Sequence, residues 1–298
     1  MESRVRRRLD WFNVLNYMIL TLFCLSILYP FYYLISISLS TAGEIYTAQN
    51  TVFYFPSTIT WEAYQKFLSM DYVYTGYFNT VFRTVAGTSL SLIVMSCAAY
   101  ALSKKTLPHL NLYTTFFIVT MFFGGGLIPT YLLIRQLNLL DNIWVFVFGG
   151  LVNAFYMLIL RNFFMSIPEE MEESARMDGA GDALIFARIV VPLSLPALAT
   201  ISLWLAVGHW NAWFDSLIYI KSIDKHVISV HIRRLVIEQD QSMSQTLIGL
   251  SNRQRGDKPT PEGMRAAAIM VTIIPILCVY PFVQKYFVQG VMVGAVKG

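Results

Sequence analysis

The sequence predicts an all-α polytopic membrane protein with six transmembrane helices. Hydrophobic residues make up 56% of the 298 residues and aromatic residues 15%, whereas charged residues make up only 13%. An ordinary soluble domain carries roughly 25% charged residues, so about half of the charge needed to cover a surface in water is missing. The formal net charge of +4 is small, and no basic stripe interleaved with aromatic residues occurs. This composition argues against a soluble dinucleotide-binding enzyme, a disordered chain and a nucleic-acid-binding module.

Six apolar stretches are long enough to cross a bilayer. A helix needs about 20 mainly apolar residues to span a hydrocarbon core of roughly 30 Å. The predicted spans are about residues 14–39, 79–103, 110–134, 142–160, 193–214 and 266–284. One such stretch alone could be a buried core helix, but six together favour membrane crossing. No Gly/Ser linker or repeat divides the chain, so residues 1–298 are expected to form a single transmembrane domain.

The amino-terminal region carries the clearest signal for orientation. Four arginines precede the first apolar run, namely Arg4, Arg6, Arg7 and Arg8. The positive-inside rule therefore predicts a cytoplasmic N-terminus. By alternation, residues 104–105 and 161–191 are internal, and residues 41–78 and 215–265 are external. The first apolar run is much longer than the core of a signal peptide, so an uncleaved first helix is expected.

The predicted cytoplasmic segment 166–192 has the pattern of a short helix, a glycine turn and a second short helix. Ser166 followed three residues later by Glu169 is a capping-box pattern, and further acids lie near the positive end of the helix dipole. Gly179 and Gly181 can take positive φ values and end the first helix, after which a helical pattern resumes. The acids alone would indicate only a solvated amphipathic loop.

The spacing within this segment is more specific than its composition. It reads Glu173-Ser174-Ala175, three residues, Gly179, nine residues, then Ile189, two residues and Pro192. This spacing resembles the signature of ABC importer permeases, which is E-A-A, three residues, G, nine residues and I-x-L-P. The resemblance implies a type I ABC importer permease fold, in which this coupling segment docks in a cleft of the ATP-hydrolysing subunit. Ser174 and Val191 replace the usual Ala and Leu, and both changes are mild.

The residue types of the coupling segment suit docking on a partner. Small Ser174 and Ala175 permit close approach, Gly179 makes the turn, and Glu173 offers a carboxylate for a charged contact. A short rigid helix of this kind could convert closure of the partner into a tilt of the neighbouring spans.

Other motifs resemble the carbohydrate-uptake branch of this family, including the smaller permease subunit of maltose importers and permeases for larger oligosaccharides and alginate. These motifs are Asn79-Thr80, Gly124-Gly-Gly-Leu-Ile-Pro129, Trp210-Asn211-Ala-Trp213, and the ending from Gln284 to Gly298. The expected function is therefore that of a permease subunit of an importer for oligosaccharides or polysaccharide fragments, with acidic ones such as alginate included. The coupling motif itself specifies the use of ATP and not the solute.

The resemblance implies partners, because the chain has no phosphate-binding loop of its own. The expected partners are a second permease in a heterodimer, an ATPase dimer that uses ATP and Mg²⁺, and an extracytoplasmic solute-binding protein in a bacterial cell membrane. No catalytic residue and no bound cofactor is expected in this chain. Its three cysteines and four histidines show no metal-site spacing, so no metal is expected either.

A path for a sugar needs hydrogen-bonding groups and flat apolar faces within the bundle. Asn153, Tyr156, His209, Trp210 and Asn211 are the candidates. Tryptophan near a membrane interface can equally belong to an aromatic belt, and Tyr156 can equally be a packing residue. The glycines that precede Pro129 indicate either close helix packing or a broken helix beside a cavity.

Two rival classes remain open from the residues alone. An ion-driven secondary transporter would need functional acids within its spans, and the six predicted spans contain no Asp or Glu. A membrane enzyme would need a paired catalytic constellation, and none is recognisable in the sequence. An ABC permease for another class of solute is the nearest alternative.

Overall fold

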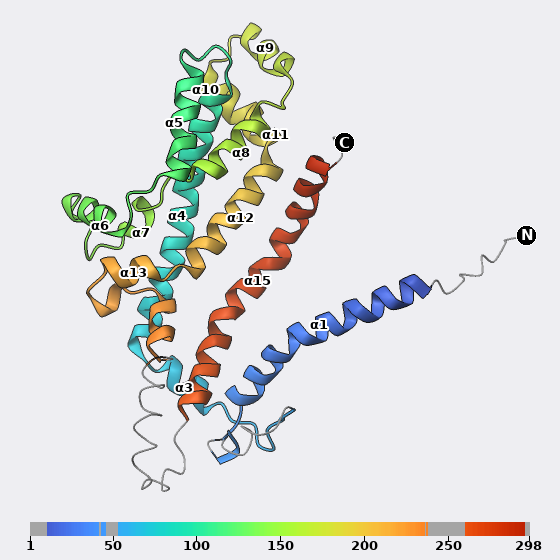
Figure 1. The fold of residues 1–298 in the computed structure, drawn as a ribbon, viewed down its shortest axis with the longest axis vertical. Coiled ribbons are helices and arrows are strands. Elements are labelled where there is room, and N and C mark those ends of the chain that lie inside the picture. The colour runs from blue at the N-terminus through green and yellow to red at the C-terminus, as the bar shows by residue number, and fades with distance from the viewer. Residues whose placement is uncertain (1–10, 42, 46–52, 236, 238–259, 296–298) are drawn as a thin grey trace, which may run out of the picture. The chain divides into compact units, whose positions relative to one another are not determined.

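The computed structural model describes residues 11–41, 43–45, 53–235, 237 and 260–295 (Figure 1). In the last helix, side chains are described as far as Cys278 and at Pro281. Throughout these residues the secondary structure is helical, with no strand. The chain divides into two compact units, Met1–Met70 with Leu235–Ile274, and Asp71–Arg234 with Pro275–Gly298. The all-α fold agrees with the prediction from composition.

The first unit contains α1 (Trp11–Ser38), α3 (Glu62–Leu68) and the first part of α15 (Pro261–Ala295). α1 is apolar on all sides, and its most hydrophobic window is 0% buried within the chain. A helix that is apolar on all sides is normally covered by lipid or by another protein. The buried side chains near its end form a small cluster of Ile37, Ile45 and Ala266.

The second unit is built on α4 (Asp71–Ser103). α8 (Ala154–Phe164) and α12 (Leu195–Asn211) pack along α4 (Figure 1). Their shared apolar cluster includes Met95, Ala99, Met157, Leu160, Ile201 and Leu205. At Gly87 an added Cβ would lie 2.6 Å from the ring of His209. Glycine at this position therefore leaves room for the His209 ring of α12 against α4.

Two of the predicted spans are interrupted. The predicted span 110–134 consists of α5 (Leu110–Phe122) and α6 (Leu127–Gln136), which are bent by 115°. Gly126 lies in the break with φ 81°, and a Cβ on Gly126 would meet no atom within 4 Å. The glycines thus break the helix, and within the described residues Gly126 makes no close helix contact. The predicted span 142–160 likewise consists of α7 (Val145–Phe148), a non-helical stretch and α8.

The number of continuous membrane-length helices is therefore smaller than predicted. Among the described residues, three helices are long and apolar enough to span a bilayer, or up to five if each bent pair counts as one span. The second bent pair joins Asp182–Leu193 to Leu195–Asn211 at an angle of 81°. α8 has only 11 residues, about 17 Å of helix at 1.5 Å per residue, which is too short to cross a bilayer alone.

Residues 213–235 form a compact helical subdomain at the Asp71 end of α4. α13 (Phe214–Tyr219), a 3-10 turn (Ile223–Lys225) and a helix at 228–235 make up this subdomain. Asn79 Nδ2 donates hydrogen bonds to the carbonyl oxygens of Asp224 at 2.8 Å and His226 at 3.1 Å. The backbone N–H of Ile228 donates to Thr80 Oγ1 at 3.0 Å. The motif Asn79-Thr80 is therefore an anchor for this subdomain.

Asp141 holds the preceding loop to the same subdomain. Its carboxylate accepts hydrogen bonds from the Ser222 hydroxyl at 2.6 Å and from the backbone N–H groups of Ser222 and Lys221. Lys225 Nζ lies 3.2 Å from its Oδ2. Because donors surround the charged form, with Ser222 contributing most, the pKa of Asp141 is well below its ordinary value.

His231 gives this subdomain a predicted dependence on pH. The side chain is 4% exposed, and its ring stacks on Tyr72 with centroids 4.7 Å apart. Burial, followed by the charges of His226 and Arg234, lowers the pKa of His231 to about 4. In the unfolded chain His231 has its ordinary pKa of about 6.5, so the unfolded chain takes up a proton on this ring at a higher pH than the folded protein does. The stability that His231 contributes is therefore present above pH about 6.5 and is lost as the pH falls toward 4.

We expect the thermal midpoint of the purified protein to fall between pH 6.5 and pH 4, and to fall less in His231→Phe, which keeps an aromatic ring but cannot titrate. The matched control is His109→Asn, because His109 is exposed and has φ 57°, a conformation that Asn tolerates. Equal pH dependence in wild type and His231→Phe would contradict this assignment.

Candidate coupling segment and transport path

The coupling segment consists of two short helices around a glycine turn. α9 (Glu169–Met177) is followed by Gly179 at φ 83° and then by α10 (Asp182–Ile185). A π-helix (Phe186–Val190) and α11 (Val191–Leu193) complete the segment. Gly181 has φ −78°, so the left-handed conformation belongs to Gly179 alone of the two glycines. The predicted order of helix, turn and helix is therefore present.

The start of α9 differs from the predicted capping box. The N-cap residue is Pro168 and no side chain caps the helix. The Ser166 hydroxyl instead donates to the carbonyl oxygen of Phe163 at 2.7 Å. Glu169 accepts a hydrogen bond from Lys105 Nζ at 2.6 Å. The prediction was wrong because both side chains have other partners, one of which lies far away in sequence.

α9 has one face toward the protein and one toward solvent. Ala175 packs against the apolar cluster on α4, and the Glu172 side chain is only 14% exposed. Glu173, Ser174 and Met177 are exposed, with Met177 at 87%. Ala175 thus supports the helix from within, whereas Glu173 and Ser174 are accessible to a partner.

The last two residues of the signature lie past the turn. Ile189 packs partly against the apolar cluster, and Pro192 is exposed within α11, two residues before the bend at Ser194. A hollow of about 340 Å³ lies beside the turn, and its lining includes Ala175, Gly179 and Ile189. Three of the signature residues therefore line one concave surface.

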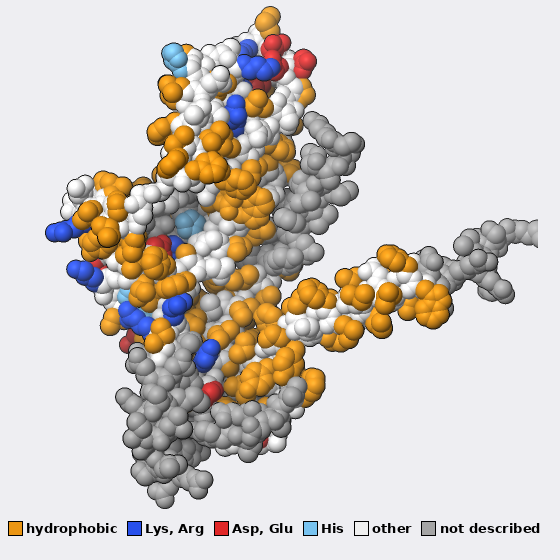
Figure 2. Space-filling view, viewed as in Figure 1, with side chains coloured by type: hydrophobic (Ala, Val, Ile, Leu, Met, Phe, Trp, Pro, Cys, Tyr) orange, Lys and Arg blue, Asp and Glu red, His pale blue; other side chains and the backbone are white. Residues whose placement is uncertain are grey.

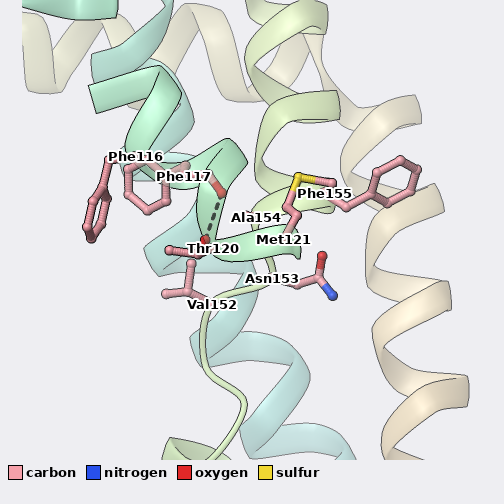
Figure 3. A pocket seen from close by; sticks show the side chains of 8 residues that line it. All are labelled: Phe116, Phe117, Thr120, Met121, Val152, Asn153, Ala154 and Phe155. Atoms are coloured by element: carbon pink, nitrogen blue, oxygen red, sulfur yellow. Dashed lines mark hydrogen bonds between the residues drawn. The ribbon is translucent and has the colours of Figure 1, made fainter. Parts of the chain in front are cut away.

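Asn153 lies where the helical path before α8 is interrupted. Its side-chain Oδ1 accepts the backbone N–H of Tyr156 at 3.2 Å and so caps α8. Asn153 also lines a cavity of about 560 Å³ together with Phe116 and Thr120 of α5 and Phe155 of α8. Figure 3 shows Phe116, Phe117 and Thr120 on one side of this cavity and Asn153 with Phe155 on the other. The amide thus has a structural role at the edge of an accessible cavity.

The other path candidates lie on or against α12. The Tyr156 ring packs on Trp204 with centroids 5.6 Å apart. His209 faces Gly87 of α4, so it is a packing contact between helices. Trp210 is half-buried, and its indole Nε1 is buried without a hydrogen-bond partner among the described residues. Asn211 ends α12 and is exposed. Asn153 is joined to Tyr156 by the hydrogen bond that caps α8.

An ion pair between a buried arginine and a partly exposed aspartate, next to this group, was not predicted. Arg83 of α4 is 2% exposed, and its guanidinium binds the Asp215 carboxylate through Nη1–Oδ1 at 3.1 Å and Nη2–Oδ2 at 2.6 Å. Nη1 also donates to the carbonyl oxygen of Ala212, and the guanidinium lies over the Phe146 ring at 4.7 Å. A charged residue in an apolar span was the available signal, but its partner 132 residues away could not be identified from the sequence.

The described residues contain no group of three or more potential metal ligands from His, Cys, Asp and Glu. Of the two buried histidines, His231 stacks on Tyr72, and its Nε2 has no hydrogen-bond partner among the described residues. Both ring nitrogens of His226 lie near polar protein atoms. His226 Nδ1 lies 3.1 Å from Ser216 Oγ, and its Nε2 lies 3.0 Å from Arg234 Nη2.

The helical bundle with its exposed helix–turn–helix segment defines a multi-pass transport permease of the membrane. No family model matches the chain. The chain is 38% identical over 287 residues to the polygalacturonan/rhamnogalacturonan transport system permease protein YtcP of Bacillus subtilis, covering 96% of this chain and 98% of the relative. It is 37% identical to the protein LplC of the same organism, covering 90% and 89%. This chain therefore belongs to the family of ABC sugar-transport permeases.

A solved structure gives the same assignment. The chain matches a bacterial ABC transporter involved in the import of the acidic polysaccharide alginate, with a TM-score of 0.83, 35% sequence identity and coverage of 96% of this chain and 99% of the solved one. The ABC importer permease fold expected from the coupling signature is thereby confirmed.

Breaking the Arg83–Asp215 ion pair should destabilise the second unit. We expect Asp215→Ala to lower the free energy of unfolding by about 2 kcal/mol, because the Arg83 guanidinium is left buried without its counter-charge. The control is Asp224→Ala, since the Asp224 side chain is exposed and only its backbone carbonyl binds Asn79. Thermal unfolding of the purified protein measures the difference, and equal midpoints for the two variants would contradict the role of the pair.

Proposed function

We propose that this chain is one permease of a heterodimeric, ATP-driven importer that takes up acidic oligosaccharides derived from uronate-containing polysaccharides. One observation carries the proposal: the exposed α9 and the left-handed Gly179 present the coupling signature in a chain with 38% identity to a polygalacturonan/rhamnogalacturonan permease. A second permease, an ATPase dimer and an extracytoplasmic solute-binding protein complete the importer. ATP and Mg²⁺ bind to the ATPase subunits.

The proposed orientation has the N-terminus and α9 in the cytoplasm of a bacterial cell. It is supported by Lys104 and Lys105, which lie beside α9 at the Ser103 end of α4. The subdomain at 213–235 lies at the Asp71 end of the same helix and is external in this orientation. Glu173, Ser174 and Met177 then face the ATPase, and Gly179 holds the turn that presents them.

Two observations support an acidic substrate. One relative is named for the transport of polygalacturonan and rhamnogalacturonan, and the solved transporter is involved in the import of the acidic polysaccharide alginate. Basic side chains gather over the region of α6 and the subdomain at 213–235 (Figure 2). Of these, Arg135, Lys221 and Arg233 take part in none of the ion pairs among the described residues. Cations at the outer end of a path raise the local concentration of a polyanionic substrate.

For the transport path itself, we propose that Trp210 and Asn211 at the end of α12 contact the sugar. Asn211 is exposed, and the neighbouring Trp210 is half-buried, with an indole Nε1 that has no hydrogen-bond partner within the described part of the chain. Asn153 lines the path at the start of α8, where the 560 Å³ cavity provides space and aromatic faces, and Tyr156 lines it beside Trp204. His209 contributes through the packing of α12 on α4.

The substrate is tested by uptake into proteoliposomes that contain the whole importer with its solute-binding protein. We expect ATP-dependent uptake of labelled oligogalacturonate, with competition by other uronate oligomers and little competition by maltodextrins of equal length. Uptake of neutral oligomers alone would contradict the acidic substrate and would favour an ABC permease for another class of solute. Uptake that needs no ATPase subunit but follows an ion gradient would favour the secondary transporter.

The glycine turn provides a second test. We expect Gly179→Ala to reduce ATP-dependent uptake about tenfold, because a left-handed conformation costs a non-glycine residue roughly 1–2 kcal/mol. Gly181→Ala is the matched control, since Gly181 has φ −78° and a Cβ there meets no atom within 4 Å. Uptake and retention of the ATPase on the purified complex are measured for both. Full uptake by Gly179→Ala would exclude the turn as a coupling element.

A further inference from the structure

Two ion pairs join the end of α4 to the coupling segment. Lys104 binds Glu172, and Lys105 Nζ lies 2.6 Å from Glu169 Oε1. The lysines directly follow Ser103, the last residue of α4, whereas both glutamates lie on α9. α9 is therefore attached to α4 across space, in addition to its connections along the chain.

The two pairs differ in their surroundings. Lys104 and Glu172 are 23% and 14% exposed, whereas Lys105 and Glu169 are 76% and 70% exposed. Lys104 Nζ also lies 4.1 Å from the ring centroid of Tyr100, which is itself buried. Fully exposed ion pairs contribute little because water screens them, while a partly buried pair is screened less. Lys104–Glu172 is therefore the stronger of the two ion pairs. The exposed Lys105–Glu169 pair, which joins the same two segments, serves as a control.

The second half of the coupling segment contacts the same turn of α4. The Tyr100 ring packs on Phe186, the first residue of the π-helix, with centroids 5.0 Å apart. Arg161 Nε, from α8, donates to the carbonyl oxygen of Leu102 at 2.8 Å. The end of α4 thus contacts α9 through Lys104, which directly follows the helix, and contacts the π-helix through Tyr100. A shift of α9 or of the π-helix would therefore disturb the end of α4.

The opposite end of α4 is held as firmly. Asn79, Thr80 and Arg83 bind backbone and side-chain groups between Ala212 and Ile228. α4 has 33 residues, so it is about 50 Å long at 1.5 Å per residue. A continuous helix that is hydrogen-bonded at both ends is the kind of rigid element that carries coupling between distant sites.

We propose that Lys104 and Glu172 are positioning residues that transmit the movement of α9 to α4, which carries it to the subdomain at 213–235. This inference rests on the proposed function, because α9 moves in this way only when it docks on an ATPase. The pair acts through the position of α4 and touches no transported solute. The Lys105–Glu169 pair adds little to the transmission.

The test follows the far end of α4 and needs no glycan. In the whole importer, with Cys24, Cys97 and Cys278 replaced by Ser, the single reporter is Tyr74→Cys in the first turn of α4, where Tyr74 is 64% exposed. Its labelling rate with a membrane-impermeant maleimide is compared with and without ATP plus vanadate. We expect a nucleotide-dependent rate in the parent, and about a fivefold smaller nucleotide effect in Lys104→Met and Glu172→Gln.

Two further sets of variants separate charge from folding. The exchange Lys104→Glu with Glu172→Lys should restore the nucleotide effect, and Lys105→Met with Glu169→Gln should leave it unchanged. Because the exchange variant contains both charges, it decides the question even if a single variant loses its ATPase. An unchanged effect in Lys104→Met and Glu172→Gln, a missing effect in the parent, or an exchange variant without recovery would each overturn the inference. Failure of glycan uptake with normal labelling would instead overturn the proposed substrate.

Discussion

The close packing of α12 on α4 is the constraint on which the second unit depends. Gly87 lacks the Cβ that would collide with the His209 ring, and so this ring can pack directly against α4. Near the same end, the Arg83–Asp215 pair joins α4 to the start of α13. These contacts fix the two helices that lead toward the coupling segment, and α8 fills the remaining face of α4 with apolar side chains. The core formed by α4, α8 and α12 supports α9, which packs on it through Ala175.

The interruptions in the helices remain hydrogen-bonded, which the surroundings require. Lipid offers no partner to a free backbone N–H or C=O group, so a break must be satisfied within the protein or face water. Asn153 caps α8 from its side chain, and the Ser194 N–H at the bend before α12 donates to the carbonyl oxygens of Val190 and Val191. Broken helices beside a cavity are a common arrangement in transporters, where they offer polar backbone to a solute.

The sequence predicted the elements that composition and local spacing determine. The helix character, the long apolar α1 and α4, and the turn at Gly179 all agree with the structure. The bend between α5 and α6 was one of two alternatives for the glycines before Pro129. The break before α8 was not predicted, because hydropathy reports transfer to lipid and not the direction of the backbone. The Arg83–Asp215 and Lys104–Glu172 pairs connect residues 132 and 68 positions apart, and one sequence holds no information on such pairings.

The π-helix at Phe186–Val190 gives a physical meaning to the spacing of the signature. A π-turn accommodates one more residue than an α-turn over nearly the same axial length. The nine residues between Gly179 and Ile189 therefore include one that a regular α-helix would not hold in this length. Removing one of them would allow this turn to adopt regular α-helical geometry. The length of this stretch thus fits the π-helical turn that contains Ile189.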